Sequence, residues 1–192
     1  MAIPPIAKAT LQAALINAGS NVLAQGIKAY RADIPFNLDT ESLMQFTTCA
    51  FITSPLGYLW LGSLESWFPG RATDSNDQSD KQGDKKNKYD QSLPKPSLNV
   101  TNTVAKIVID QAIGGAWNTV LFIVIMGLLR GLDYDTITGQ IQADFWSIMV
   151  AGLKLWPLVS VLNFTVVPAD QRLLVGSLFG IVWAIYLSLM SG

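Results

Sequence analysis

Histidine is absent from this chain of 192 residues, and cysteine occurs only once, at Cys49. Without histidine, the chain cannot form a catalytic triad built on that residue or a His-ligated metal site. A single cysteine forms neither an intrachain disulfide nor a Cys-rich zinc site. No phosphate-loop motif is present either. We therefore expect that the chain is not an enzyme and that it binds no cofactor and no metal.

Charge is also scarce. Only 14% of the residues are charged, whereas soluble domains carry about 25%. Many of the charged residues fall between Arg71 and Lys95, where lysines alternate with aspartates, and the formal net charge is -1. A mixed segment of this kind offers no field of one sign to hold nucleic acid, so we expect no nucleic-acid partner. The remaining tracts are nearly free of charge, which is typical of membrane proteins.

Five stretches are long enough to cross a hydrocarbon core of about 30 Å, which takes roughly 20 apolar residues. They are residues 6–27, 42–64, 103–129, 145–167 and 171–190. The first is rich in Ala, Asn and Gln, and taken alone it also fits an amphipathic helix in the membrane interface. The sequence therefore predicts an all-α integral membrane protein in a single domain, 1–192, built as a bundle of four to five transmembrane helices.

Two polar segments connect these stretches. Residues 71–98 have mixed charge and no apolar periodicity, so we expect a disordered polar loop between the second and third helices. The segment RGLDYDTITGQIQADFW links the third and fourth helices. There Asp135, followed by Thr136, is predicted to cap a short interfacial helix.

Each predicted helix carries polar residues that lipid would not accept. Helical spacing places Lys106 and Asp110 one turn apart on one face, where they are able to pair. The candidate pore-lining or intramembrane polar residues are Asn17, Asn21, Lys106, Asp110, Asn118, Lys154, Asn163 and Arg172.

Two interpretations of these residues stay open. Small and polar residues pack membrane helices together through hydrogen bonds worth on the order of 0.6 to 2 kcal/mol. An ionisable group at the centre of a helix costs roughly 2.5 to 3.5 kcal/mol, which favours a hydrated interior around Asp110 and Lys154. Lys106 and Arg172 lie nearer the predicted helix ends, where a side chain can reach the interface by snorkelling.

Prolines shape the stretch KLWPLVSVLNFTVVPADQR, residues 154–172. Pro157 lacks a backbone donor and is predicted to kink the fourth helix three residues after Lys154. Pro168 is predicted to end that helix at a short turn through Asp170, which then caps the last helix. We read this turn as a hairpin between two membrane helices, with Arg172 close to the headgroups.

The order of these motifs resembles the Mpv-seventeen / twenty-two-kilodalton peroxisomal membrane protein family. The family's C-terminal signature matches Trp156-Pro157, Asn163-Phe164, Val167-Pro168, Arg172, Trp183 and Tyr186-Leu187-Ser188, and upstream elements match Pro55, Trp60, Lys106, Asp110 and Gln111. Other positions depart from it, with Ser54 in place of a Gly, Tyr58 of a His, Leu61 of an aromatic residue and Asn21 of an Asp.

The resemblance implies an organelle membrane protein with four spans and a weakly selective channel for small polar solutes. The short pieces SNVLAQ and ADFW look nearer to the peroxisomal branch, and the mitochondrial inner membrane is the alternative location. A non-conducting scaffold or tether that organises the membrane is the alternative function. The partners expected are the lipid bilayer, small polar solutes for a channel, and further copies of the chain as a homo-oligomer.

Overall fold

The computed structural model describes residues 3–70 and 98–190. Within these residues every regular element is a helix, so the expected all-α class is confirmed. The polar loop expected at residues 71–98 lies outside the described residues, apart from Leu98. The helices are α1 (Pro5–Arg31), α2 (Thr40–Trp67), α3 (Val100–Ile109), the π-helical η1 (Asp110–Gly114), α4 (Gly115–Leu129), α5 (Tyr134–Gly152), α6 (Trp156–Thr165), the 3-10 turn η2 (Ala169–Gln171) and α7 (Arg172–Met190).

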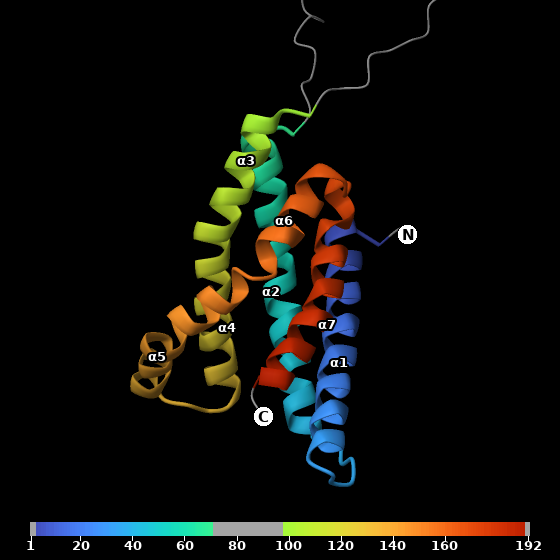
Figure 1. The fold of residues 1–192 in the computed structure, drawn as a ribbon, viewed down its shortest axis with the longest axis vertical. Coiled ribbons are helices and arrows are strands. Elements are labelled where there is room, and N and C mark those ends of the chain that lie inside the picture. The colour runs from blue at the N-terminus through green and yellow to red at the C-terminus, as the bar shows by residue number, and fades with distance from the viewer. Residues whose placement is uncertain (1–2, 71–97, 191–192) are drawn as a thin grey trace, which may run out of the picture.

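The first two helices form a long hairpin, and α7 packs along α1 (Figure 1). The hairpin is closed by Gln25, whose side chain accepts a hydrogen bond from the Asp39 N–H at 2.8 Å and donates one to the Asp39 carbonyl at 3.1 Å. The Asp39 carboxylate also caps α2 by accepting from the Ser42 N–H at 2.9 Å. Such a cap satisfies one of the backbone donors that every helix leaves free at its start.

The predicted third helix is a continuous helical run from Val100 to Leu129. Its middle, Asp110–Gly114, is π-helical, which the sequence did not predict. On the far side of this turn, Ile125 and Met126 of α4 pack against Cys49 of α2 and form a small apolar core cluster.

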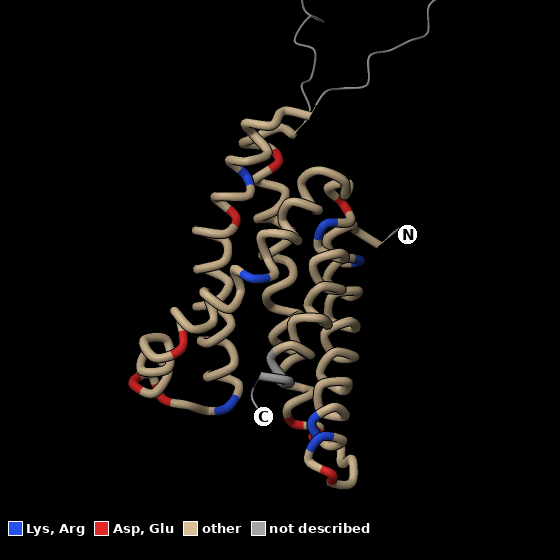
Figure 2. The backbone as a smooth tube through the Cα atoms, in the orientation of Figure 1, with Lys and Arg blue, Asp and Glu red and all other residues tan. Residues whose placement is uncertain are grey.

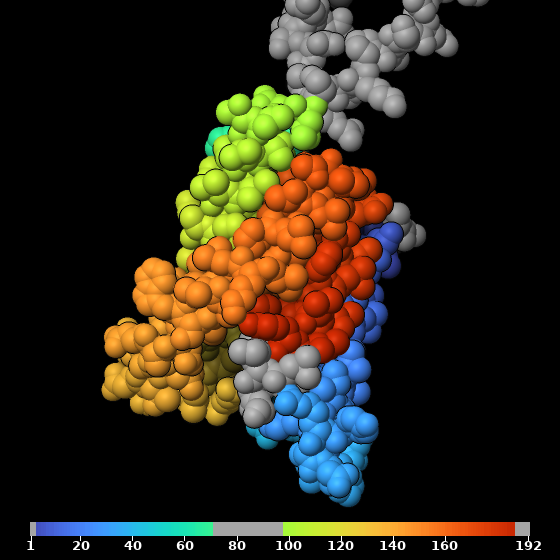
Figure 3. All heavy atoms as spheres, in the orientation of Figure 1, coloured from blue at the N-terminus to red at the C-terminus, as the bar shows by residue number. Residues whose placement is uncertain are grey.

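The prediction of one fourth helix over residues 145–167 is wrong. Helix α5 already begins at Tyr134, so the short interfacial helix expected near Asp135 is its first part, and Asp133 occupies the cap position. α5 ends at Gly152, and α6 continues from Trp156 at an angle of 54°. Pro157 lies in the first turn of α6, where its missing N–H breaks no hydrogen bond. Figure 3 shows α5 standing out to one side of the molecule.

Many of the buried residues are small or polar, and many large apolar residues are exposed. Ala13, Ala14 and Lys106 are almost fully buried, whereas Leu15, Trp146 and Leu158 are more than 60% exposed. Buried polar side chains beside many exposed large apolar ones are typical of helices that pack in lipid. Charged residues lie mostly near the ends of the helices (Figure 2).

Length and apolar composition single out fewer spans than predicted. In the described part of the chain, Val100–Leu129 is long and apolar enough to cross a membrane, and the bent pair α5 and α6 is a second if both belong to one span. The bundle of four to five spans is thus supported for these segments only. The helix α1 is long enough at 27 residues but less apolar.

Candidate functional site

Three charged side chains from three helices meet in the structure. The Glu65 carboxylate accepts from Lys106 Nζ at 2.8 Å and from Arg172 Nη1 at 2.5 Å. Both cations are buried, with side chains 0% and 7% exposed, whereas the Glu65 side chain is 31% exposed. We call these three residues the charge cluster. It ties α2, α3 and α7 together and has a formal charge of +1.

Local backbone geometry holds Glu65 in place. The Gly70 N–H donates to Glu65 Oε1 at 2.9 Å just after α2 ends. A Cβ on Gly70 would lie 2.8 Å from Lys106 Nζ and 3.3 Å from Glu65 Oε1, so a side chain at this position would displace the charged groups. Asn99 then caps α3 by accepting from the Asn102 N–H, and its own N–H donates to the Gly70 carbonyl. These contacts fix α3 against the end of α2.

Helix α6 covers the two cations. The Phe164 ring contacts both of them, with Lys106 Nζ and Arg172 Cζ each 5.2 Å from its centroid. Arg172 Nε donates to the Asn163 and Val167 carbonyls at 3.0 and 3.3 Å. An aromatic face and carbonyl oxygens both stabilise positive charge away from water. The cations are therefore held by more than their one carboxylate.

A second polar group, which we call the carboxylate cluster, surrounds Asp110. Asp110 Oδ1 accepts from Trp60 Nε1 at 3.0 Å, and Oδ2 accepts from the Ser160 hydroxyl at 2.6 Å. Gln111 Nε2 donates to Ser160 Oγ at 2.8 Å and lies 3.4 Å from Asp110 Oδ2. All three donors are neutral, and no described cation forms an ion pair with Asp110.

The predicted pairing of Lys106 with Asp110 is therefore wrong. Both residues lie where the helical spacing placed them, but Lys106 turns to Glu65, an acid from another helix. Asp110 begins the π-helical turn, and Gly114 ends it. A Cβ on Gly114 would lie 2.7 Å from Trp60 Nε1 and 3.1 Å from Asp110 Oδ1, so the missing side chain makes room for the indole.

The other predicted residues lie in different surroundings. Asn163 is buried beside the charge cluster, and its Oδ1 has no hydrogen-bond partner among the described residues. Asn21 is buried between α1 and α2 and donates to Ser42 Oγ at 3.3 Å. Asn17 bonds the Ala13 carbonyl of its own helix, whereas Asn118 and Lys154 are exposed. Only Lys106, Asp110, Asn163 and Arg172 come together in one region.

Glu65 is the residue that the sequence analysis missed. Its signal was an acidic side chain directly after the predicted span 42–64, where a buried partner for Lys106 could have been sought. The sequence shows that Trp60, Ser160 and Gln111 can donate hydrogen bonds. Their convergence on Asp110 depends on how α2, η1 and α6 cross, which the sequence does not show. In the described ranges, no group of three or more His, Cys, Asp or Glu side chains lies close enough to hold a metal.

Comparison with known proteins agrees with the resemblance. A profile of the Mpv17 / PMP22 family matches residues 127–188. The protein sym1 of Schizosaccharomyces pombe is 25% identical over 96% of this chain and 84% of its own length. An Mpv17-like protein of Bos taurus is 31% identical over 69% of this chain and 53% of its own length. The PXMP2/4 family protein 3 of Dictyostelium discoideum is 25% identical over 97% and 84%.

No solved structure matches the chain. The matched relatives include several proteins named Sym1 as well as the PXMP2/4 family protein. They therefore do not single out the peroxisomal branch that the short motifs favoured. The profile match contains α5, the bend, α6 and most of α7, which includes the Trp-Pro, Asn-Phe and Val-Pro pairs of the resemblance. These matches and the order of the motifs together place the chain in the Mpv17 / PMP22 family.

Proposed function

We propose that this chain is a multi-pass organelle membrane protein that forms a weakly selective channel for small polar solutes. The Mpv17 / PMP22 family consists of membrane proteins. The exposed apolar side chains of the described helices support several spans, and the four to five expected from the sequence remain part of this proposal. Lipid would cover these side chains, and the buried small and polar residues would face one another.

The observation that carries the proposal is the carboxylate cluster. Asp110 lies in the helical run that is long and apolar enough to cross a membrane, yet no described cation neutralises it. An acid in such a helix is expensive and marks a functional site by default. The π-helical turn at Asp110 points the same way, because single π turns occur frequently at functional sites. A fixed negative charge of this kind would bias the passage of ions.

The second candidate is a non-conducting scaffold or tether, and the charge cluster favours it. Glu65, Lys106 and Arg172 satisfy one another and lock three helices, which is what a purely structural protein requires. In that case the polar residues fix the arrangement of the helices and line no path. Both candidates involve the lipid bilayer and further copies of the chain as partners, and the channel adds small polar solutes.

Conductance of the purified protein in planar bilayers separates the two candidates. For a channel, Asp110→Asn should move the reversal potential in a salt gradient towards anions, because it removes a fixed negative charge. Its partners are neutral, so we expect a stability loss of only about 1 to 3 kcal/mol. Asp144→Asn, at an exposed position of α5, is the matched control and should leave the reversal potential unchanged.

Absence of conductance in both the unmodified chain and the variants would contradict the channel function and favour the scaffold function. Conductance with an unchanged reversal potential in Asp110→Asn would support a channel but would show that Asp110 does not line its path.

The location proposed is an organelle membrane. The short motifs favour the peroxisomal membrane. The relatives named Sym1 add no support for the peroxisomal branch, so the mitochondrial inner membrane is the alternative location. Expression of the full chain with a fluorescent tag, imaged beside markers of both organelles, decides between them.

A further inference from the structure

The geometry points to an anion-binding site at the bend between α5 and α6, made by Lys154, Tyr186 and the indole rings of Trp156 and Trp183. Neither the charge cluster nor the carboxylate cluster includes these residues. The ligand class is a small soluble carboxylate or phosphate. The inference rests on the membrane topology of the proposed function and does not depend on conduction.

Two hydrogen-bond donors converge at this place. Lys154 Nζ donates to Tyr186 Oη at 3.3 Å and lies 5.9 Å from the centre of the same ring. An ammonium group has three N–H donors, so two remain, and the Tyr186 hydroxyl can still donate its own proton. Lys154 is exposed, and no described carboxylate forms an ion pair with it. The pair can therefore bind an oxyanion between them.

Aromatic rings form a firm wall beside these donors. The Trp183 and Tyr186 rings stack at 5.4 Å with an interplanar angle of 21°, and Trp156 lies 6.2 Å from Trp183. The Trp156 indole rests on the bare backbone of Gly152, where a Cβ would lie 3.2 Å from Cδ1. Rings held by their neighbours keep Tyr186 in one orientation, so its hydroxyl stays near Lys154.

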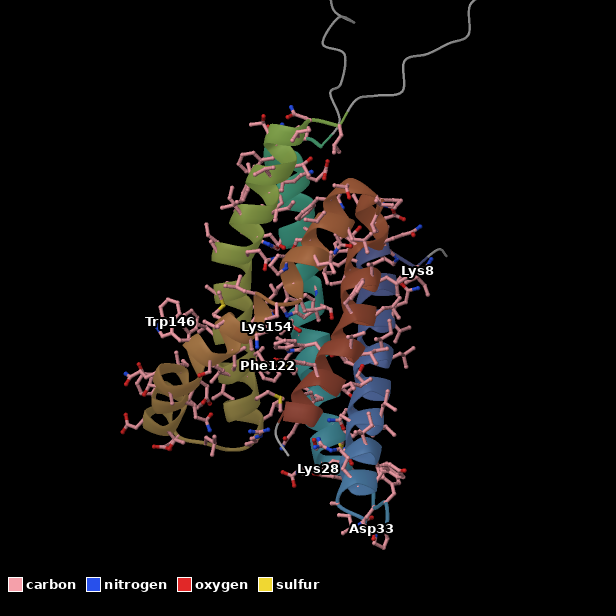
Figure 4. All side chains as sticks on the ribbon, viewed as in Figure 1. Lys8, Lys28, Asp33, Phe122, Trp146 and Lys154 are labelled. Carbon is pink, nitrogen blue, oxygen red and sulfur yellow. The ribbon has the colours of Figure 1, made fainter. Side chains whose placement is uncertain are left out.

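The broken helix adds a favourable field. The first turn of α6 follows the bend, and the N-terminus of a helix carries unpaired N–H groups and partial positive charge. α5 and α6 meet at 54° with Lys154 in the break between them. Discontinuous membrane helices bind anionic groups of their substrates in this way, with the N-terminus of a half-helix turned towards the ligand. Figure 4 shows Lys154 in the middle part of the molecule, away from the lower end where Lys28 and Asp33 lie.

Depth decides what the ligand is. If α5 and α6 together cross the membrane, Lys154 lies near the middle of the apolar segment 145–165. A lone ammonium group at that depth is costly, so a counter-anion is strongly favoured. Phospholipid headgroups lie at the interface and do not reach the middle of the hydrocarbon region. A small soluble anion that enters from water is therefore the ligand that fits.

Titration of the full chain in phosphatidylcholine nanodiscs tests this inference. Sodium acetate and inorganic phosphate are the probes, ionic strength is kept constant, and tryptophan fluorescence is the readout because two indoles line the site. We expect a saturable change with at least one probe. Lys154→Gln should weaken binding about tenfold or more, and Tyr186→Phe by about threefold, because hydrogen bonds to a charged group are the strong ones. Lys8→Gln, an exposed lysine of α1, should change nothing.

Lys154→Arg keeps the charge and should retain binding, so it tests the inference even if Lys154→Gln does not fold. No saturable change with either probe in the unmodified chain would overturn the inference, and so would identical titrations of Lys154→Gln and the unmodified chain. A repeat in nanodiscs with added phosphatidylglycerol distinguishes the source of the anion. Loss of the probe signal there would assign the site to a lipid phosphate and overturn the soluble ligand. Because no current is measured, failure here is distinguishable from failure of the channel.

Discussion

Replacing Glu65 with Gln is the most direct test of how the bundle is held together. The substitution keeps the shape of the side chain and removes the only carboxylate among the described residues that forms an ion pair with Lys106 and Arg172. Both cations are almost fully buried, so they would remain away from water without a counter-charge. Breaking a buried ion pair from one side costs about 3 to 5 kcal/mol. Because the Glu65 side chain is 31% exposed, and water can enter on its side, we expect the lower end, about 3 kcal/mol.

Denaturant unfolding of the purified chain in detergent measures this loss as a change in the free energy of unfolding. Glu41→Gln is the matched control, because Glu41 lies in the first turn of the same helix, is exposed, and accepts a hydrogen bond from the Gln45 side chain at 3.0 Å. We expect its effect to stay within about 0.5 kcal/mol. Lys106→Met in the Glu65→Gln background should recover part of the loss, since it removes one stranded cation and keeps its volume.

A loss below about 1 kcal/mol for Glu65→Gln would refute this reasoning, because exposed ion pairs give values of that size. It would mean that the cations reach water or that Phe164 and the backbone carbonyls stabilise them sufficiently. Strictly additive losses for Glu65→Gln and Lys106→Met would likewise show that the two side chains do not interact.

Gly114→Ala should destabilise the bundle by about 1 to 3 kcal/mol, because the new methyl group overlaps the Trp60 indole. Gly62→Ala has open space around its Cβ and should be neutral or stabilising. Denaturant unfolding of both variants measures the difference in their free energies of unfolding. Asp39→Ala should cost about 1 kcal/mol in the same assay through loss of the α2 cap, and an unchanged stability would show that the α1–α2 hairpin does not need it. Extraction of membranes with carbonate at high pH should leave the chain in the pellet, and quantitative release into the supernatant would contradict the multi-pass topology.

The sequence predicted the helices better than their ends and joints. Apolar runs located α1, α2, α7 and the run 100–129, because long segments with few breaks have one stable conformation in lipid or in a bundle. The sequence analysis predicted a kink at Pro157, whereas the helix is interrupted at residues 153–155. There the chain stops being helical before the proline, since Pro157 is accommodated best in the first turn of a new helix.

Lys106, Asp110, Asn163 and Arg172 of the candidate site were predicted from the sequence, whereas Glu65 and the pairings were not. Lys106 and Asp110 share a helix face, and periodicity favours a contact within that helix. The competing contact with Glu65 comes from another helix, so it depends on the packing of α3 on α2, which no local pattern contains. The same holds for Asp110, whose partners Trp60 and Ser160 are 50 residues away on either side.

The π-helical turn at Asp110–Gly114 makes the run 100–129 behave as two α-helices that are rotationally out of phase. Faces counted at 100° per residue from Lys106 no longer apply beyond Gly114. Deleting a single residue from this turn would restore a regular α-helix and rotate everything that follows relative to α3. Either Lys106 would then lose Glu65, or Ile125 and Met126 would turn away from Cys49. The bundle is therefore more sensitive to the number of residues in this turn than to the identity of several of them.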